Sequence, residues 1–356
     1  MASITPSNLP KEPVYELDPQ GDVILLVFNV PDGLPADLNH LRLSLLAGNM
    51  RLPNKPRSFV KLLVSKKALG LSSNYFAGSF NNPALAANQT EVDSHPFLAI
   101  LHHDVGGLAF LIIMLIVHHR TRRVPLKLTL DRLIEVAHLT RYYKCHGTLS
   151  IWEKTWTQAL MGSTQVLHTP AEVTARIMDW VYIAYAFHDR DLFSKTTKIA
   201  IDTQPNLMHT HLPLPAVIID RMNASRLTWL TTLTHELNDL REAINDGCYR
   251  AEMPGVTQHN LCSYLVHGRF AETMLRLGLY PFPAPPFVGL RIQEIVEIFR
   301  DVEDWPGPSE GEDFYGTIHD FCRLSTRLAS MLYLRLGEPE VLDIDDVEFP
   351  FSRADW

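Results

Sequence analysis

The residues best suited to chemistry in this 356-residue chain are histidines that lie near acidic side chains. His235-Glu236-Leu237-Asn238-Asp239 nearly matches the H-E-x-x-H motif of zinc proteases, in which two histidines four residues apart on a helix hold the metal. Asp239 stands where the second histidine belongs, and no third ligand follows in a suitable context. We interpret the pair as ordinary polarity on a helix surface. An enzyme with a metal site in the helical region, using His235, stays open as an alternative.

Other chemically capable residues form no known catalytic pattern. His209 and His211 flank Thr210, but with 16 histidines in the chain such a spacing arises by chance. His102-His103 and His118-His119 bracket an apolar run, where we expect them to cap a helix or face solvent. A G-x-S-x-G elbow is absent, and no cysteine has a catalytic signature around it. The sequence therefore predicts no catalytic residue, no cofactor and no metal.

The apolar run from Val105 to Val117 is the main element that the sequence predicts near these histidines. Its thirteen positions are too few to cross a bilayer, which takes roughly 20, and they fit a buried core helix. Asp104 before the run and the basic cluster 118–123 after it complement a helix dipole. Gly106-Gly107 at its start indicates close helix packing rather than a phosphate loop. We interpret the basic cluster as a solvated helix end.

Composition and charge narrow the class of protein. With 46% hydrophobic residues, the chain is long enough for two domains with separate cores. A net charge of −8 argues against direct binding of nucleic acid over a broad surface. The four cysteines are widely spaced, which favours reduced thiols in the cytoplasm or nucleus. Residues 1–13 are polar and lack the apolar core of a signal peptide, so we expect a disordered lead-in and an intracellular protein that does not enter a membrane.

The first part of the chain reads as a small mixed α+β domain over residues 14–146. Apolar runs bounded by turn residues predict strands at 23–28, 59–64 and 97–101. A short helix containing Ala68 and Leu69 precedes Ser72-Ser73, which can cap a helix that carries Tyr75 and Phe76. Thr129 is the predicted N-cap of a helix over 130–143. The stretch 34–56, rich in Pro, Asn and Gly, is predicted to be a long loop.

Beyond residue 146 the pattern is helical, which predicts an all-α domain over 147–337. Thr169-Pro170-Ala171-Glu172 is a capping box that begins a helix reaching about Phe187. Further helices are predicted after Asp189 and after Pro215, and another over 292–299, with a rigid proline-rich connector at 280–287. The tryptophans on these helices indicate core packing. The acidic residues from Glu338 to Glu348 predict a frayed stretch at the start of an acidic tail over 338–356.

Four segments, read in order, resemble a BTB/POZ domain of the kind found in fungal proteins. Tyr15–Leu25 looks like the lead-in strand. Leu63–Leu69 followed by Ser73–Phe76 is similar to the family's V-H-K-x-x-L…S-x-x-F helix pair. His118–Pro125 is similar to the stretch after the central helix, and Leu133–Cys145 to the closing L-x-x-x-A-x-x-Y helix. Ser65 replaces the usual histidine, and the loop 34–56 is longer than in a compact member.

The resemblance implies a fold, partners and a surface. The fold would be a helix cluster capped by a short sheet, with 105–117 as its central helix. The activity would be protein–protein association without catalysis or cofactor, either as a homodimer or as an adaptor on a cullin-type ubiquitin ligase scaffold, in which case the helical domain would recruit the substrate. The family dimer forms around the first strand and the helices that here carry Tyr75 and Phe76. These two residues are therefore the predicted interaction surface.

Overall fold

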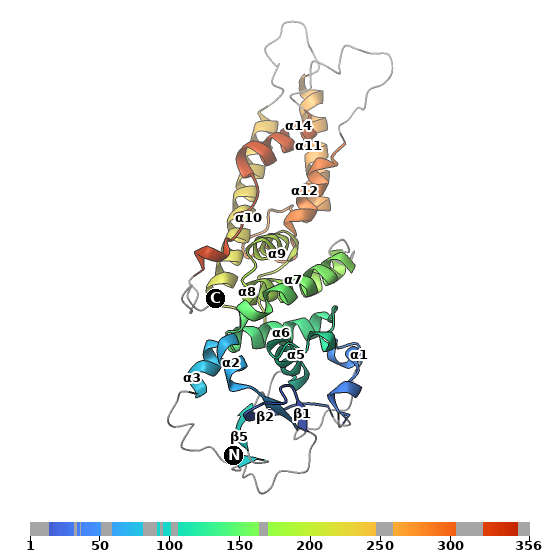
Figure 1. The fold of residues 1–356 in the computed structure, drawn as a ribbon. Coiled ribbons are helices and arrows are strands. Elements are labelled where there is room, and N and C mark those ends of the chain that lie inside the picture. Colours follow the sequence, from blue (N-terminus) through green and yellow to red (C-terminus); the bar gives the residue numbers. More distant parts are fainter. Residues whose placement is uncertain are drawn as a thin grey trace. The chain divides into compact units, whose positions relative to one another are not determined.

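The computed structural model describes residues 14–31, 34–35, 37–50, 59–80, 91–92, 95–100, 106–163, 170–246, 259–303 and 323–347. Contacts within the chain divide it into two compact units (Figure 1). The first contains residues 1–169, 182–189 and 348–356, and the second contains 170–181 and 190–347. Helix α7 (His146–Ser163) packs against α5 (Gly107–Val117) and α6 (Leu130–Tyr142), so the first unit extends beyond the predicted boundary at 146.

In its described residues, the first unit has one mixed sheet of five strands in the order β1-β3-β2-β5-β4. The strands are β1 (Val14–Glu16), β2 (Val23–Phe28), β3 (Phe59–Val64), β4 (Glu91–Val92) and β5 (His95–Ile100). The predictions for β2 and β3 are confirmed, and these strands pair antiparallel from Val23 opposite Val64 to Phe28 opposite Phe59. β2 also runs parallel to β5. Because β2 lies in the middle of the sheet, five of its six residues are buried, as expected for a strand covered on both faces.

Helix α5 (Gly107–Val117) is the centre of the first unit, and every one of its residues is buried. It packs against β2 and the helices α1 (Leu43–Leu46), α2 (Lys66–Ser72), α6 and α7 (Figure 1). Gly107 lets the helix start against the sheet: a Cβ there would lie 2.6 Å from both the Phe28 carbonyl oxygen and the Val30 Cγ1. The predicted core helix and the close packing at Gly107 are confirmed. Asp104 lies outside the described residues.

The stretch predicted as a long loop at 34–56 contains two short helical elements, so that prediction was wrong for residues 37–50. A 3-10 turn, η2 (Leu38–His40), is capped by Asp37, whose Oδ1 accepts the Asn39 N–H at 2.8 Å. Helix α1 (Leu43–Leu46) follows and buries Leu45 and Leu46. The proline and asparagine content masked a short amphipathic turn that contributes to the core.

Side-chain caps start the helices on either side of α5; the cap at Thr129 was predicted and the one at Ser65 was not. Ser65 Oγ accepts the Ala68 N–H at the start of α2 (Lys66–Ser72). Thr129 Oγ1 accepts the Arg132 N–H at the start of α6 (Leu130–Tyr142), as predicted. Each cap satisfies one of the free N–H groups that a helix start leaves. The 3-10 turn η3 (Thr121–Arg123) connects α5 to α6.

The secondary-structure elements that the structure describes in the second unit are all helical. Its elements are most of α8 (Pro170–Ala186), then α9 (Arg190–Thr203), α10 (Ala216–Asn245), α11 (His259–Arg276), α12 (Ile292–Arg300), α14 (Leu324–Met331), the π-helical η6 (Leu332–Leu336) and the 3-10 turn η7 (Ile344–Asp346). The predicted helix starts at 170, 190, 216 and 292 are confirmed. With the sheet and helices of the first unit, this makes an α+β protein.

Arg226, on α10, is fully buried and has no acidic partner among the described residues. Its guanidinium instead donates to five backbone carbonyls: Nε to Gln204 at 3.0 Å, Nη1 to Pro286 at 3.2 Å, and Nη2 to Pro205, Phe287 and Leu290 at 3.0, 3.0 and 2.8 Å. Burial lowers the pKa of Arg226 from its ordinary value. The cage ties the proline-rich connector to α10 through the carbonyls of Pro286 and Phe287.

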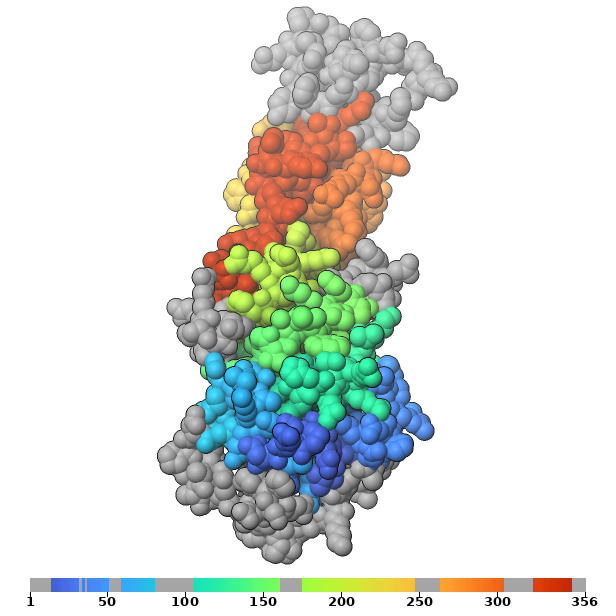
Figure 2. Space-filling model, in the orientation of Figure 1, coloured from blue at the N-terminus to red at the C-terminus, as the bar shows by residue number. Residues whose placement is uncertain are grey.

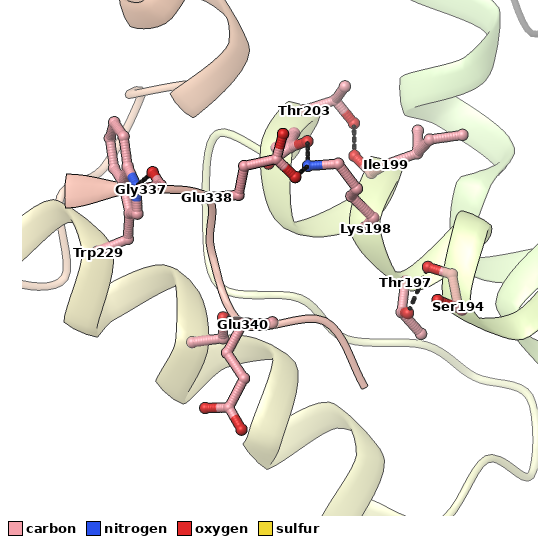
Figure 3. Close-up of polar contacts among 11 residues, drawn as sticks. Ser194, Thr197, Lys198, Ile199, Thr203, Trp229, Gly337, Glu338 and Glu340 are labelled. Atoms are coloured by element: carbon pink, nitrogen blue, oxygen red, sulfur yellow. Dashed lines mark hydrogen bonds and ion pairs between the residues drawn. The ribbon is translucent and has the colours of Figure 1, made fainter. Parts of the chain in front are cut away.

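The predicted frayed tail is, over residues 337–347, an ordered segment that we call the C-terminal strap (Figure 3). Three side chains of α10, four residues apart, donate to strap carbonyls: Arg221 to Asp346 at 3.0 Å, Ser225 to Glu340 at 2.8 Å and Trp229 to Gly337 at 3.0 Å. The strap therefore runs antiparallel to α10.

Ion pairs and apolar burial also fix the strap, and they explain why the tail prediction was wrong. Lys198 Nζ lies 3.1 Å from Glu338 Oε2, and Arg190 pairs with Asp345. Leu342 and Ile344 are buried. The negative charges that suggested fraying are thus partly neutralised by cations of α9, while the apolar residues between them join the core. Residues 348–356 lie outside the described part.

Candidate interaction surface

Ser73 connects the helix that carries the predicted surface to the body of the first unit. Its Oγ accepts the Phe76 N–H at 3.2 Å, which caps α3 (Asn74–Phe80), and the same hydroxyl donates to the Tyr143 carbonyl at the end of α6. Because one buried hydroxyl makes both bonds, the start of α3 is held against the end of α6. The cap predicted at Ser72-Ser73 is confirmed at Ser73.

Phe76 and Tyr143 form the buried base of this region. Their rings stack with centroids 4.9 Å apart and an interplanar angle of 6°. Phe76 is 1% exposed and Tyr143 2%. Phe110 of α5 lies 5.2 Å from the Tyr143 ring, which joins the base to the central helix. Of the two residues predicted as an interaction surface, Phe76 is thus a core residue whose ring is not accessible to a partner.

Tyr75 and Tyr142 lie on this base and reach solvent. Tyr75 is 38% exposed and Tyr142 50%. Tyr75 contacts Tyr142 at 5.4 Å and meets Tyr143 edge-on at 5.2 Å between ring centroids. Partial burial, and then the neighbouring Tyr142 hydroxyl, raise the pKa of Tyr75. The Tyr75 hydroxyl can therefore act as a neutral donor and acceptor near neutral pH.

Sequence reasoning identified Tyr75 but missed Tyr142. The sequence signal for Tyr142 is that it stands next to Tyr143 at the end of a predicted amphipathic helix. Side chains of adjacent helical residues point about 100° apart, so when one of the two tyrosines packs into the core the other can face solvent. Leu71, at the end of α2, is 80% exposed and was also missed as a surface residue. Helices α2 and α3 form the light-blue part of the face in Figure 2. We call Tyr75 and Tyr142 the tyrosine face.

Most of the basic cluster after α5 is solvated, as predicted, and His118 is the C-cap residue of that helix. His118 is buried: its Nδ1 lies 2.9 Å from the Met114 carbonyl oxygen, and its Nε2 accepts the Ser65 N–H at 3.1 Å. Desolvation lowers the pKa of His118. The imidazole thus joins the end of α5 to the turn between β3 and α2. His119 is exposed, as predicted.

A buried titratable pair lies on α7. His146 Nδ1 is 3.3 Å from Glu153 Oε1, and both side chains are about one-tenth exposed. Desolvation raises the pKa of Glu153, and the nearby Asp189 carboxylate raises it further, against the lowering effect of His146. Cys145 is a buried free thiol next to this pair, and desolvation raises its pKa as well. A thiol held in its protonated form is a poor nucleophile, so this arrangement does not favour chemistry.

The candidate metal ligands lie apart from one another or at the surface. His235 Nδ1 is 3.3 Å from Asp239 Oδ2 on the exposed side of α10, and His209 and His211 are exposed. In the described ranges, no group of three or more His, Cys, Asp or Glu side chains is placed to hold a metal ion. Cys248 and Cys322 fall outside those ranges.

Comparison with known proteins leaves the geometry as the main guide to function. Among the helices that the structure describes, none has the length and apolarity needed to cross a membrane. No protein-family model matches the chain, and no curated protein matches it.

Proposed function

We propose that this protein is an interaction module whose N-terminal part is a BTB/POZ-like domain and which self-associates through the tyrosine face. The proposal is supported by the four ordered segments that resemble that family and by a mixed fold in which helices surround a small sheet. No chemistry is assigned to the chain. Its function on this proposal is to bring a second copy into contact.

The observation that carries the proposal is a pair of half-exposed tyrosines on a rigid aromatic base. Tyrosine is enriched among the few residues that dominate binding energy at interfaces. Stacking of Phe76 on Tyr143 and the Ser73 bonds fix the backbone beneath Tyr75. Since the side chains are already partly ordered, binding would cost less conformational entropy than at a flexible surface.

A second copy is the partner that this face suits best. In a two-fold dimer the same patch meets itself, so the patch must be complementary to its own copy. Tyrosine meets this condition because its hydroxyl both donates and accepts a hydrogen bond and its ring packs on another ring. A face of one charge sign would repel its copy, whereas the tyrosine face carries no formal charge.

The test is sedimentation velocity of the full chain from about 1 to 100 μM, where a weak dimer would be populated. We expect Tyr75→Ser combined with Tyr142→Ser to weaken self-association at least about 30-fold, corresponding to about 2 kcal/mol for a lost interface anchor. Tyr264→Ser is the matched control, because Tyr264 is an exposed tyrosine of the second unit at 73%. The control should associate like the unchanged protein.

Two results would overturn the proposal. One is a wild-type chain that stays monomeric at 100 μM; the other is a double variant that melts normally and dimerises as strongly as the wild type. Thermal melting of each variant shows whether the fold is retained, since removal of half-exposed rings should lower the melting temperature only slightly.

A further inference from the structure

A second surface of the first unit, separate from the tyrosine face, lies at the open edge of β1. β1 is the terminal strand of the sheet and pairs only with β3 among the described strands. Leu17 N–H donates to the Leu63 carbonyl at 3.0 Å, so the backbone groups of the odd-numbered residues face β3. In a strand the direction alternates, and the N–H and C=O groups of Val14 and Glu16 therefore face away from the sheet. No described residue bonds to them.

A cavity of about 780 Å³ runs along this edge. One wall is β1 itself, the second is the η2 turn at residues 37–39, and the third is the segment 119–123 after the central helix. The last wall brings three arginines, Arg120, Arg122 and Arg123, to a free strand edge. A strand edge without hydrogen-bond partners can pair with another strand, and the side chains around that edge determine which strand sequence binds.

Two of the three arginines are held in place and one is available. Arg120 Nε donates to the Leu17 carbonyl at 3.0 Å, and Arg123 Nη2 donates to Asn39 Oδ1 at 3.0 Å. Arg122 is exposed and has no hydrogen-bond or ion-pair partner in the described part of the chain. The fixed arginines position the wall, while the Arg122 guanidinium can still bind a carboxylate through two parallel hydrogen bonds.

The cavity also contains two carboxylates, and the balance of charge still favours an anion. Asp37 is engaged locally: it accepts the Asn39 N–H at 2.8 Å and lies 3.5 Å from His40. Glu16 is exposed on β1 and has no ion-pair partner in the described residues. Three arginines line the cavity together with these two acidic groups.

We propose that the β1 edge binds an extended acidic segment of a partner protein as an added strand, with its carboxylates on Arg122 and the neighbouring arginines. A peptide supplies the alternating N–H and C=O groups that Val14 and Glu16 leave unmatched, which a nucleic acid does not. The net charge of −8 also disfavours nucleic acid. Because β1 has only three residues, few main-chain bonds can form, and we expect weak, salt-sensitive binding.

The test is fluorescence anisotropy of the full chain with a labelled eight-residue peptide that alternates Glu and Thr. We expect this peptide to bind, an equal-length Lys–Thr peptide not to bind, and binding to weaken at least about 10-fold when alternate peptide nitrogens are methylated. Arg122→Gln should weaken binding about 5-fold or more. Lys127→Gln removes the same charge from an exposed position outside the cavity and should change little.

Glu16→Gln gives a test of opposite sign, because removing a like charge from the strand edge should strengthen binding about 2- to 5-fold. The proposal fails if the Glu–Thr peptide does not bind, or if Arg122→Gln binds it as well as the wild type. Equal binding of the methylated peptide would exclude strand addition. Tighter, Arg122-dependent binding of a single-stranded oligonucleotide would show that the cavity recognises phosphate and would also overturn the proposal.

Discussion

Replacing Arg226 with Met tests whether the carbonyl cage holds the second unit together. The substitution removes the donor to five carbonyls while keeping a long side chain in the core. The Phe287 and Leu290 bonds are fully buried, and the other three are partly buried. A buried carbonyl left without a donor costs about 1–3 kcal/mol. The two buried groups therefore predict a loss of about 2–6 kcal/mol, with the other three adding little because water can reach them.

Hydrogen exchange measured by mass spectrometry is the suitable assay, because a chain of two compact units need not unfold in one step. The amides of Phe287 to Leu290 should exchange faster in Arg226→Met, since Gly289 N–H is itself bonded to the Pro205 carbonyl at 2.9 Å beside the cage. The amides of α5, in the first unit, should exchange as in the wild type. Arg226→Lys should have an intermediate effect, because its three donors cannot reach all five carbonyls.

Arg221→Met is the matched control: it is the same change on the same helix, at an exposed residue with one bond to Asp346 at 3.0 Å. We expect it to cost less than about 1 kcal/mol. If Arg226→Met left the opening free energy at 287–290 within about 0.5 kcal/mol of the wild type, the cage would not hold the connector, and the energetic reasoning above would be wrong.

Three further predictions concern the first unit. Gly107→Ala should destabilise the first unit by about 1–3 kcal/mol, because the added Cβ meets backbone and a β-branched side chain. Gly70→Ala, whose Cβ would lie 3.9 Å from Ala77, should instead stabilise it by up to about 1 kcal/mol. Urea denaturation of the two variants distinguishes these opposite signs. The pKa of His118 is lowered in the folded state, so the stability that the neutral ring contributes is present above about pH 6.5 and is lost as the pH falls. In denaturation series from pH 7.5 to 5.5, His118→Asn should reduce this pH dependence of stability, and the control His119→Asn should not. The pKa of Glu153 is raised in the folded state, so the stability that its protonated form contributes is present at low pH and is lost as the pH rises through the folded pKa. Glu153→Gln should therefore gain stability relative to the wild type as the pH increases from about 4.5 to 7. A stability difference that stays constant over this range would contradict the assignment.

Local sequence signals predicted much of the fold. The run at 107–117 is apolar on every side, and a helix of that kind has to be surrounded by other elements. Thr129 and Ser73 are short polar residues directly before helical patterns, and both form the expected caps. Turn residues on both sides of β2 fixed its ends. These features depend on neighbours in the chain, which is why they could be read without a structure.

The features that the sequence did not reveal depend on distant contacts. Arg226 was not recognised as a core residue because arginine is ordinarily exposed, although Met222, Trp229 and Leu230 place it on the buried face of α10. The clue was the connector at 280–287, whose prolines supply carbonyls without N–H groups. His118 was predicted to cap a helix or face solvent, and it is the C-cap residue of α5. Its bond to Ser65 was not predicted, because Ser65 lies 53 positions earlier in the chain.

The cations that pair with the C-terminal strap also could not be predicted from neighbouring residues in the sequence. The acidic tail resembles a frayed end until Arg190 and Lys198 are brought beside it. Phe76 is the opposite case, a residue predicted to be exposed that is buried. The family-like pattern predicted it at the surface, but its ring stacks on Tyr143 in the core. Only Tyr75 of that predicted pair remains available to a partner.

The antiparallel course of the C-terminal strap on α10 has a mechanical consequence. A force that pulls Val347 away from α10 would not load the three strap bonds together. It would reach the Arg221 bond first, then that of Ser225 and finally that of Trp229, so the strap would peel like a zipper at low force. The same bonds pulled along the helix axis would share the load and resist as a set. The force needed to detach the strap should therefore depend strongly on the direction in which the strap is pulled.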